Sequence, residues 1–84
     1  MSKTQHELKI RPEYFEAIVN GEKTFEVRFN DRNFAKGDLL ILREHDENGY
    51  TGRTRTVEVI YLLDDPNYCK KGYVIMAIKN VTSP

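Results

Sequence analysis

Hydrophobic and polar residues alternate along most of this chain, and one early segment shows helical spacing instead. Alternation with period two is typical of half-buried strands, whereas apolar residues three and four positions apart indicate an amphipathic helix. The elements predicted on this basis, in chain order, are a strand at 6–11, a helix at 12–20, and strands at 23–29, 39–43, 54–63 and 73–79. The pattern therefore predicts a mainly β protein with one or two short helices.

The helix has clear start and stop signals. Pro12 suits a first helical turn, where its missing N–H group is not needed, and Asn20-Gly21 is a typical helix end. The predicted apolar stripe consists of Tyr14, Phe15, Ile18 and Val19. A helix this short is stable only when such a stripe packs against the sheet.

The strand that follows Gly21 has two chemically different faces. Phe25, Val27 and Phe29 are predicted to face the core. Thr24, Glu26 and Arg28 are predicted to lie on the opposite face, with Lys23 at the turn. A compact polar cluster backed by aromatic core is therefore expected just after the helix.

The later strands indicate how the sheet closes. Residues 39–43 are apolar on both faces and should form the most buried strand, and Asn48-Gly49 predicts a hairpin turn. The strand at 54–63 is predicted to place Val57, Val59, Tyr61 and Leu63 on one face. We expect a small sheet of five to six strands that curls into a barrel, since closure removes exposed edges; an open sheet with the helix on one face is the alternative.

Length and composition limit the possible functions. The 84 residues fit a single domain spanning 1–84, with flexible ends expected at 1–5 and 81–84. Thirteen basic and thirteen acidic side chains balance, which argues against non-specific capture of polyanions. Cys69 is the single cysteine, and no apolar run is long enough to cross a membrane. A cytoplasmic protein without a membrane association is expected, and the sequence does not predict its oligomeric state.

The polar cluster is the main candidate site. A carboxylate at Glu26 accepts hydrogen bonds, and a guanidinium at Arg28 can grip phosphate or carbonyl oxygens in a fork. Lys23, partly buried beside the turn, could serve as a base. The alternative is an exposed strand face with an ion pair worth about 0 to 1 kcal/mol. Likewise, the tyrosines at 50, 61, 68 and 73 are either stacking surfaces for bases or core residues.

Other chemistry is weakly represented. His6 and His45, with Asp46 and Glu47, match no familiar metal-ligand spacing, so no metal is expected. The glycines are dispersed, so a phosphate-binding glycine-rich loop is absent and no cofactor is predicted.

The segment Gly21-x-Lys23-x-x-Glu26-x-Arg28 resembles the signature of ASCH domains, which are relatives of the PUA RNA-binding fold. The similarity extends over nearly the whole chain. Its further motifs are His6-Glu7-Leu8-Lys9, Pro12-Glu13-Tyr14-Phe15, Asn30-Asp31-Arg32, Gly37-Asp38 and Gly72-Tyr73. Together they resemble a compact bacterial and phage family of ASCH-like proteins.

The resemblance implies a β-barrel with a cleft beside the helix and a ligand that is RNA or a modified nucleoside. Some bacterial members hydrolyse N4-acetylcytidine with a lysine, a threonine three residues later and a distant glutamate. Lys23 matches that lysine, but Glu26 stands in place of the threonine, and Thr24 directly follows Lys23. This departure removes the presumed nucleophile and argues against that reaction.

Two functions of different classes are therefore expected to compete. The first is binding of RNA or a nucleotide-like ligand, with a site formed by Lys9, Lys23, Glu26, Arg28 and Arg32. The second is hydrolysis of a modified nucleoside such as N4-acetylcytidine, with Lys23 and Glu26 as catalytic candidates. A phage-type protein that binds another protein through the same cleft is a third possibility.

Overall fold

The computed structural model describes residues 4–81, and its secondary structure follows the predicted order. The elements are β1 (Gln5–Ile10), α1 (Pro12–Val19), β2 (Phe25–Phe29), β3 (Leu39–Asp46), β4 (Gly49–Leu63) and β5 (Tyr73–Asn80). The mainly β prediction with a short helix after the first strand is confirmed. The flexible ends expected at 1–5 and 81–84 lie mostly outside the described residues, but Gln5 belongs to β1 and the Val81 N–H donates to the Thr56 carbonyl.

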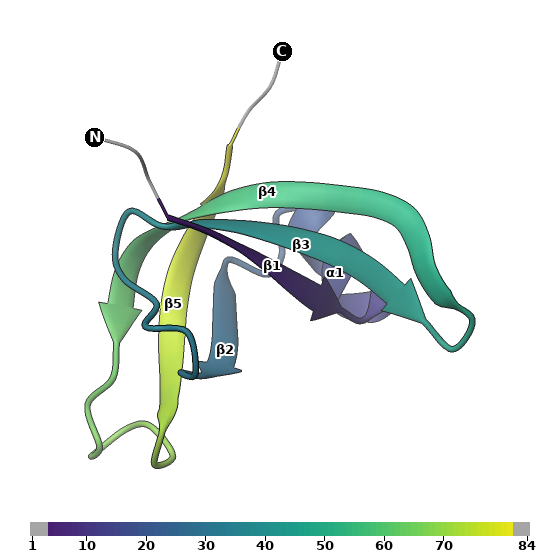
Figure 1. The fold of residues 1–84 in the computed structure, drawn as a ribbon. Helices are drawn as coiled ribbons and strands as arrows, with labels where there is room; N and C mark the ends of the chain where they lie inside the picture. The colour runs from purple at the N-terminus through teal and green to yellow at the C-terminus, as the bar shows by residue number, and fades with distance from the viewer. Residues whose placement is uncertain (1–3, 82–84) are drawn as a thin grey trace.

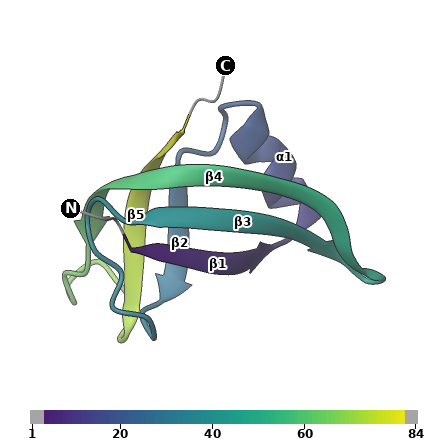
Figure 2. The same cartoon turned by 45° about the horizontal axis from the view of Figure 1, so that its top comes forward.

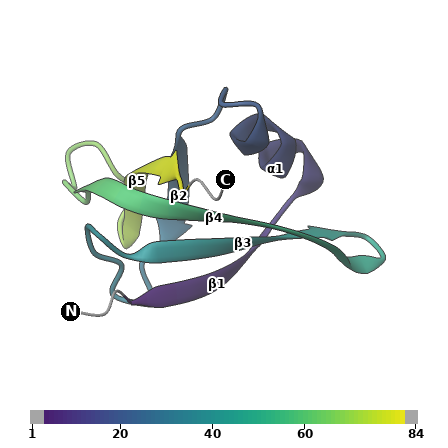
Figure 3. The same cartoon turned by 90° about the horizontal axis from the view of Figure 1, so that it is seen from above.

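A single curled sheet of five strands forms the fold, in the order β1-β3-β4-β5-β2. The β1 and β3 strands are parallel, and the other neighbours are antiparallel. The sheet curls so that β5 and β2 run across the direction of β1, β3 and β4 (Figure 1). Since β1 and β2 are its two edge strands, the sheet is a half-barrel with an open seam between them (Figure 3).

The core fills the concave side of the half-barrel. Leu40 and Leu42 of β3 are fully buried, as are Val57 and Val59 of β4. The α1 helix packs near β3 and adds Phe15 to the same core (Figure 2). The prediction that residues 39–43 form the most buried strand is correct for one face, while its other face is half-buried.

The long strand β4 changes face near its end. Its pairing with β5 shifts register between Val59 and Tyr61, which indicates a bulge at Ile60. The extra residue reverses the alternation, so Val59 is buried whereas Tyr61 is 61% exposed. The prediction that Tyr61 and Leu63 share a face with Val57 and Val59 is therefore wrong.

The faces of β2 are also reversed relative to the prediction. Glu26 is buried, whereas Phe25, Val27 and Phe29 are about half exposed. The polar side chains point into the concave side, where ionic partners satisfy them, and the aromatic side chains point outward. The prediction of an aromatic core behind an exposed polar face is wrong.

A buried polar pair holds the connection from β2 to β3. His6 Nε2 on β1 lies 2.9 Å from Asp38 Oδ2, and the Ala35 N–H donates to the same oxygen at 3.0 Å. Phe34 packs edge-on against the His6 ring with centroids 4.8 Å apart. The segment between β2 and β3 is thereby fixed to the first strand.

Candidate functional site

The end of α1 positions the first charged residue of the site. Gly21 has a φ of 81°, a left-handed conformation that favours glycine, and its N–H donates to the Ile18 carbonyl. The N–H groups of Glu22 and Lys23 both donate to the Ala17 carbonyl. This closed turn brings the chain back across the helix end and directs Lys23 toward β2.

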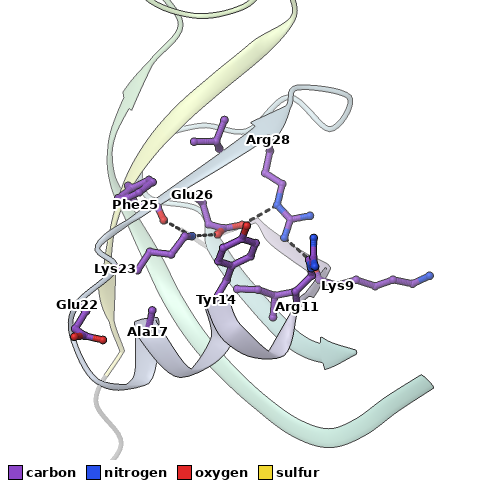
Figure 4. Close-up of a pocket in the computed structure, with 11 residues that line it drawn as sticks. Lys9, Arg11, Tyr14, Ala17, Glu22, Lys23, Phe25, Glu26 and Arg28 are labelled. Atoms are coloured by element: carbon purple, nitrogen blue, oxygen red, sulfur yellow. Dashed lines mark hydrogen bonds and ion pairs between the residues drawn. The ribbon is translucent and has the colours of Figure 1, made fainter. Parts of the chain in front are cut away.

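Glu26 lies at the centre of the predicted cluster, with cations on both sides (Figure 4). Its Oε1 is 2.5 Å from Lys23 Nζ, and its Oε2 is 2.7 Å from Arg28 Nε. The Glu26 side chain is only 5% exposed, compared with 14% for Lys23 and 25% for Arg28. Two cations and one carboxylate leave one positive charge in excess, and both carboxylate oxygens are engaged.

The same cations also bind backbone carbonyls. Lys23 Nζ donates to the Phe25 carbonyl at 2.7 Å, and Arg28 Nη2 donates to the Lys9 carbonyl at 2.6 Å. The second bond crosses the open seam from β2 to β1. Arg32 makes a similar contact, because its Nη1 donates to the Glu7 carbonyl at 2.7 Å.

A pocket of about 650 Å³ opens over this cluster, beside α1. Pockets for small ligands commonly measure about 300–1,000 Å³. The lining residues come from β1, α1, the turn and β2: Lys9, Ile10, Arg11, Tyr14, Ala17, Glu22, Lys23, Phe25, Glu26, Val27 and Arg28. Lys23, Glu26 and Arg28 therefore share one concave site, as predicted.

Two of the predicted site residues play different parts. Lys9 takes part through its backbone carbonyl, while its side chain extends away from Glu26 (Figure 4). Arg32 does not line the pocket and lies further along the seam. Of the five residues proposed from the sequence, Lys9, Lys23, Glu26 and Arg28 line the pocket and Arg32 does not; that they bind a ligand stays a prediction.

Aromatic side chains beside Lys23 were not predicted as part of the site. The Lys23 Nζ lies 5.7 Å from the centroid of the Tyr14 ring and 5.0 Å from that of Phe25. Tyr14 is 45% exposed rather than part of the core stripe. The sequence does hold a signal for this part of the site. Residues three positions apart lie on one face of a helix, and the pocket is lined by such a series, Arg11, Tyr14 and Ala17.

Within residues 4–81, no group of three histidine, cysteine or carboxylate side chains is arranged to hold a metal ion. No helix in this part of the chain is long and apolar enough to cross a membrane.

Comparison with known proteins supports a family assignment. The model of a family described as "Domain of unknown function (DUF3850)" matches residues 5–78, which include every strand and the helix except the last residues of β5. The chain belongs to the DUF3850 family. This match includes all the residues that line the pocket.

A phage protein is related to this DUF3850 chain. The "Uncharacterized 12.9 kDa protein in GpA 3'region" of Escherichia phage P2 is 44% identical over 48 residues. The aligned segment covers 57% of this chain and 44% of the phage protein, so the chain spans less than half of that relative.

A solved structure has a similar fold. The crystal structure of hypothetical protein PH0355 has a TM-score of 0.65, with coverage of 93% of this DUF3850 chain and 100% of that chain. Only 17% of the aligned residues are identical, so the likeness concerns the fold alone.

Proposed function

We propose that the pocket beside α1 binds RNA or a nucleotide-type ligand. The observation that carries the proposal is the cluster of two ion pairs, Lys23–Glu26 and Arg28–Glu26, which lines a pocket with aromatic side chains beside it. A cationic floor suits phosphate or carbonyl oxygens, and exposed aromatic rings suit the planar face of a base. A cytoplasmic setting, predicted from the sequence, would accord with such a ligand.

Glu26 acts in this proposal as a positioning residue. Both of its oxygens already accept from Lys23 and Arg28, which fixes the directions of the two cationic groups. The remaining N–H groups of Lys23 and Arg28, which donate neither to Glu26 nor to a backbone carbonyl, are the donors available to the ligand. The pocket should therefore prefer ligands rich in acceptors, because phosphate and carbonyl oxygens match donor groups.

We also propose that the chain is related to ASCH domains of the PUA-like group. What supports this is the position of the signature residues. Gly21 closes the helix, and the three charged residues of the motif, Lys23, Glu26 and Arg28, line one pocket.

Hydrolysis of a modified nucleoside is the second candidate function. The observation in its favour is that a carboxylate and two cations meet inside the pocket, so that Glu26 would serve as the base for a water and Lys23 or Arg28 would stabilise the oxyanion. Binding is preferred because each Glu26 oxygen already accepts a charge-assisted hydrogen bond from Lys23 or Arg28, and two adjacent cations make the carboxylate a weaker base. Cytidine released from N4-acetylcytidine, and lost in Glu26→Gln, would favour the hydrolase instead.

Binding can be tested by titrating a labelled single-stranded RNA and nucleoside monophosphates at two salt concentrations. We expect Lys23→Met and Arg28→Ala to raise the Kd by roughly tenfold to a hundredfold, because each removes a charged hydrogen-bond donor. Each variant should also reduce the salt dependence of RNA binding.

The matched control is Arg43→Ala, because Arg43 is a half-exposed arginine on β3 that does not line the pocket. Urea denaturation of each variant establishes that it is folded. The proposal fails if neither RNA nor nucleotide binds, or if the Lys23 and Arg28 variants bind as tightly as the Arg43 control.

A further inference from the structure

The outward surface of β4, β5 and β2 is a continuous apolar face on the side opposite the core. In its middle row, Ile75 of β5 is paired with Leu63 of β4 and with Val27 of β2. Ile75 lies between the buried Val74 and Met76, and side chains alternate along a strand, so Ile75 and its two partners point away from the concave side. The three strands lie side by side in the sheet (Figure 1).

Aromatic side chains extend this row on both sides. Toward one end, Ala77 lies between Tyr61 and Phe25, and toward the other end Tyr73 is paired with Phe29. The Phe29 ring stands edge-on to Tyr73, with centroids 5.5 Å apart. We call the surface formed by these eight residues the outer apolar face; its members are Phe25, Val27, Phe29, Tyr61, Leu63, Tyr73, Ile75 and Ala77.

The loop before β5 adds a hollow to this face. A depression of about 360 Å³ lies between the loop residues Tyr68 and Lys70 and the strand residues Val27 and Ile75. Tyr68 is 76% exposed at its rim, and the buried Cys69 donates from Sγ to the Leu63 carbonyl, which holds the loop in place. The face is therefore shaped as well as apolar.

The exposed area approaches the requirement of a stable dimer. Tyr61 is 61% exposed, Phe29 56%, Val27 49% and Phe25 46%. With aromatic side chains of about 150–250 Å² each, these residues and Tyr68 together expose roughly 600 Å². That is at the upper end of the largest apolar patches on monomers, about 300–600 Å², and close to the ~800 Å² that each partner of a specific complex buries.

Charges at the ends of the face make it complementary to itself. The loop at one end carries Asp64 and Asp65 together with Lys70 and Lys71. The next row at the other end pairs Glu58 with Lys79, whose charged groups are 4.0 Å apart. Each end thus holds both signs in equal number. A partner of strongly acidic or basic character would find no complement there, whereas a second copy would.

We infer that the outer apolar face is the interface of a homodimer, in which a second copy of this chain covers the same face. The aliphatic middle row with aromatic residues around it is typical of a protein interface core. A surface for nucleic-acid bases would need cations between its rings. Lys70 lies 5.7 Å from the Tyr73 ring centroid and Lys23 lies 5.0 Å from that of Phe25, both at the margins of the face, whereas the middle row of Leu63, Ile75 and Val27 is uncharged. The outer apolar face meets the ligand pocket at Phe25 and Val27, which belong to the face and also line the pocket.

The test is sedimentation velocity of the full chain from about 1 µM to 1 mM, a range in which even a weak homodimer is populated. Tyr61→Asp and Tyr68→Asp, two exposed positions whose substitution leaves the core intact, should each weaken the dimer at least ~tenfold. Ile75→Glu in the middle row should yield a monomer. Tyr50→Asp is the matched control, because Tyr50 is a similarly exposed tyrosine on the β3–β4 hairpin, away from this face.

A dimer that dissociates in the first three variants and persists in Tyr50→Asp supports the inference. A wild-type chain that is monomeric over the whole range overturns it, as does a dimer that none of the three variants weakens. Thermal unfolding of each variant separates dissociation from misfolding. If the wild type is monomeric and RNA binding is lost in Tyr61→Asp and Tyr68→Asp, the face is a stacking surface instead.

Discussion

Replacing Glu26 with alanine is expected to lower the free energy of unfolding by about 3 kcal/mol, because it leaves two neighbouring cations without their shared carboxylate. Lys23 and Arg28 would then repel each other in a partly buried site where each is now held within 2.7 Å of Glu26. Urea denaturation gives the free energy directly. The corresponding fall in Tm for a chain of this size exceeds ~10 °C.

The matched control for this prediction is Glu7→Ala. Glu7 also forms an ion pair with an arginine, at 3.4 Å from Arg43, but its side chain is 64% exposed. A pair of this kind contributes about 0 to 1 kcal/mol. Glu26→Gln keeps the shape of the side chain and isolates the effect of charge. Equal free energies of unfolding for Glu26→Ala and Glu7→Ala would contradict the claim that Glu26 stabilises the fold by pairing with Lys23 and Arg28.

Replacing Asp38 with alanine should cost about 2–3 kcal/mol. The buried Asp38 Oδ2 accepts from the Ala35 N–H and contacts His6 Nε2, and both partners would lose this oxygen in a site closed to water. The effect should be accompanied by faster amide exchange in the segment between β2 and β3, since this oxygen joins that segment to β1. Urea denaturation and hydrogen exchange measure the two consequences.

Asp31→Ala in the same segment is the appropriate comparison. Asp31 is 65% exposed, and its oxygen lies 3.9 Å from Arg32, so its loss should change stability by less than ~0.5 kcal/mol. If Asp38→Ala proves as stable as Asp31→Ala, the buried pair with His6 does not hold this segment.

Local pattern was enough to predict the elements and their order. Period-two alternation marks β1, and Pro12 with Asn20-Gly21 marks the limits of α1 within a residue of those observed. These signals are local, since a helix start or stop depends on a few neighbouring residues. The composition of the cluster after Gly21 likewise predicted that Lys23, Glu26 and Arg28 would meet.

Local pattern could not predict which face of β2 points into the core. The strand alternates equally well in either orientation, and the rule that apolar residues face the core chose Phe25, Val27 and Phe29. At the edge of a half-barrel, however, the concave side of β2 is where Lys23 and the β1 carbonyls can satisfy Glu26 and Arg28. Partners distant in sequence therefore decided the orientation.

The end of β4 shows a second limit of sequence patterns. A one-residue bulge at Ile60 turns Tyr61 outward, although Val57, Val59 and Tyr61 form a perfect period-two series. Bulges depend on the pairing with the neighbouring strand rather than on the strand's own sequence. Both wrong predictions concern the outer apolar face, because each of them assigned exposed residues of β2 or β4 to the core.

The two sides of β2 thus serve two proposed purposes. Glu26 and Arg28 point into the concave side and form the charged part of the pocket, whereas Phe25, Val27 and Phe29 belong to the outer apolar face, and Phe25 and Val27 also line the pocket.

The most direct test of the proposed ligand site is a ¹H–¹⁵N correlation spectrum of the labelled chain, recorded while a nucleoside monophosphate or a short single-stranded RNA is added. The account predicts the largest shifts at residues 9–11, at Tyr14 and at residues 22–28, which surround the pocket. The β3–β4 hairpin at residues 43–53 should stay unchanged. Shifts confined to that hairpin, or a spectrum that does not change at millimolar ligand, would contradict it.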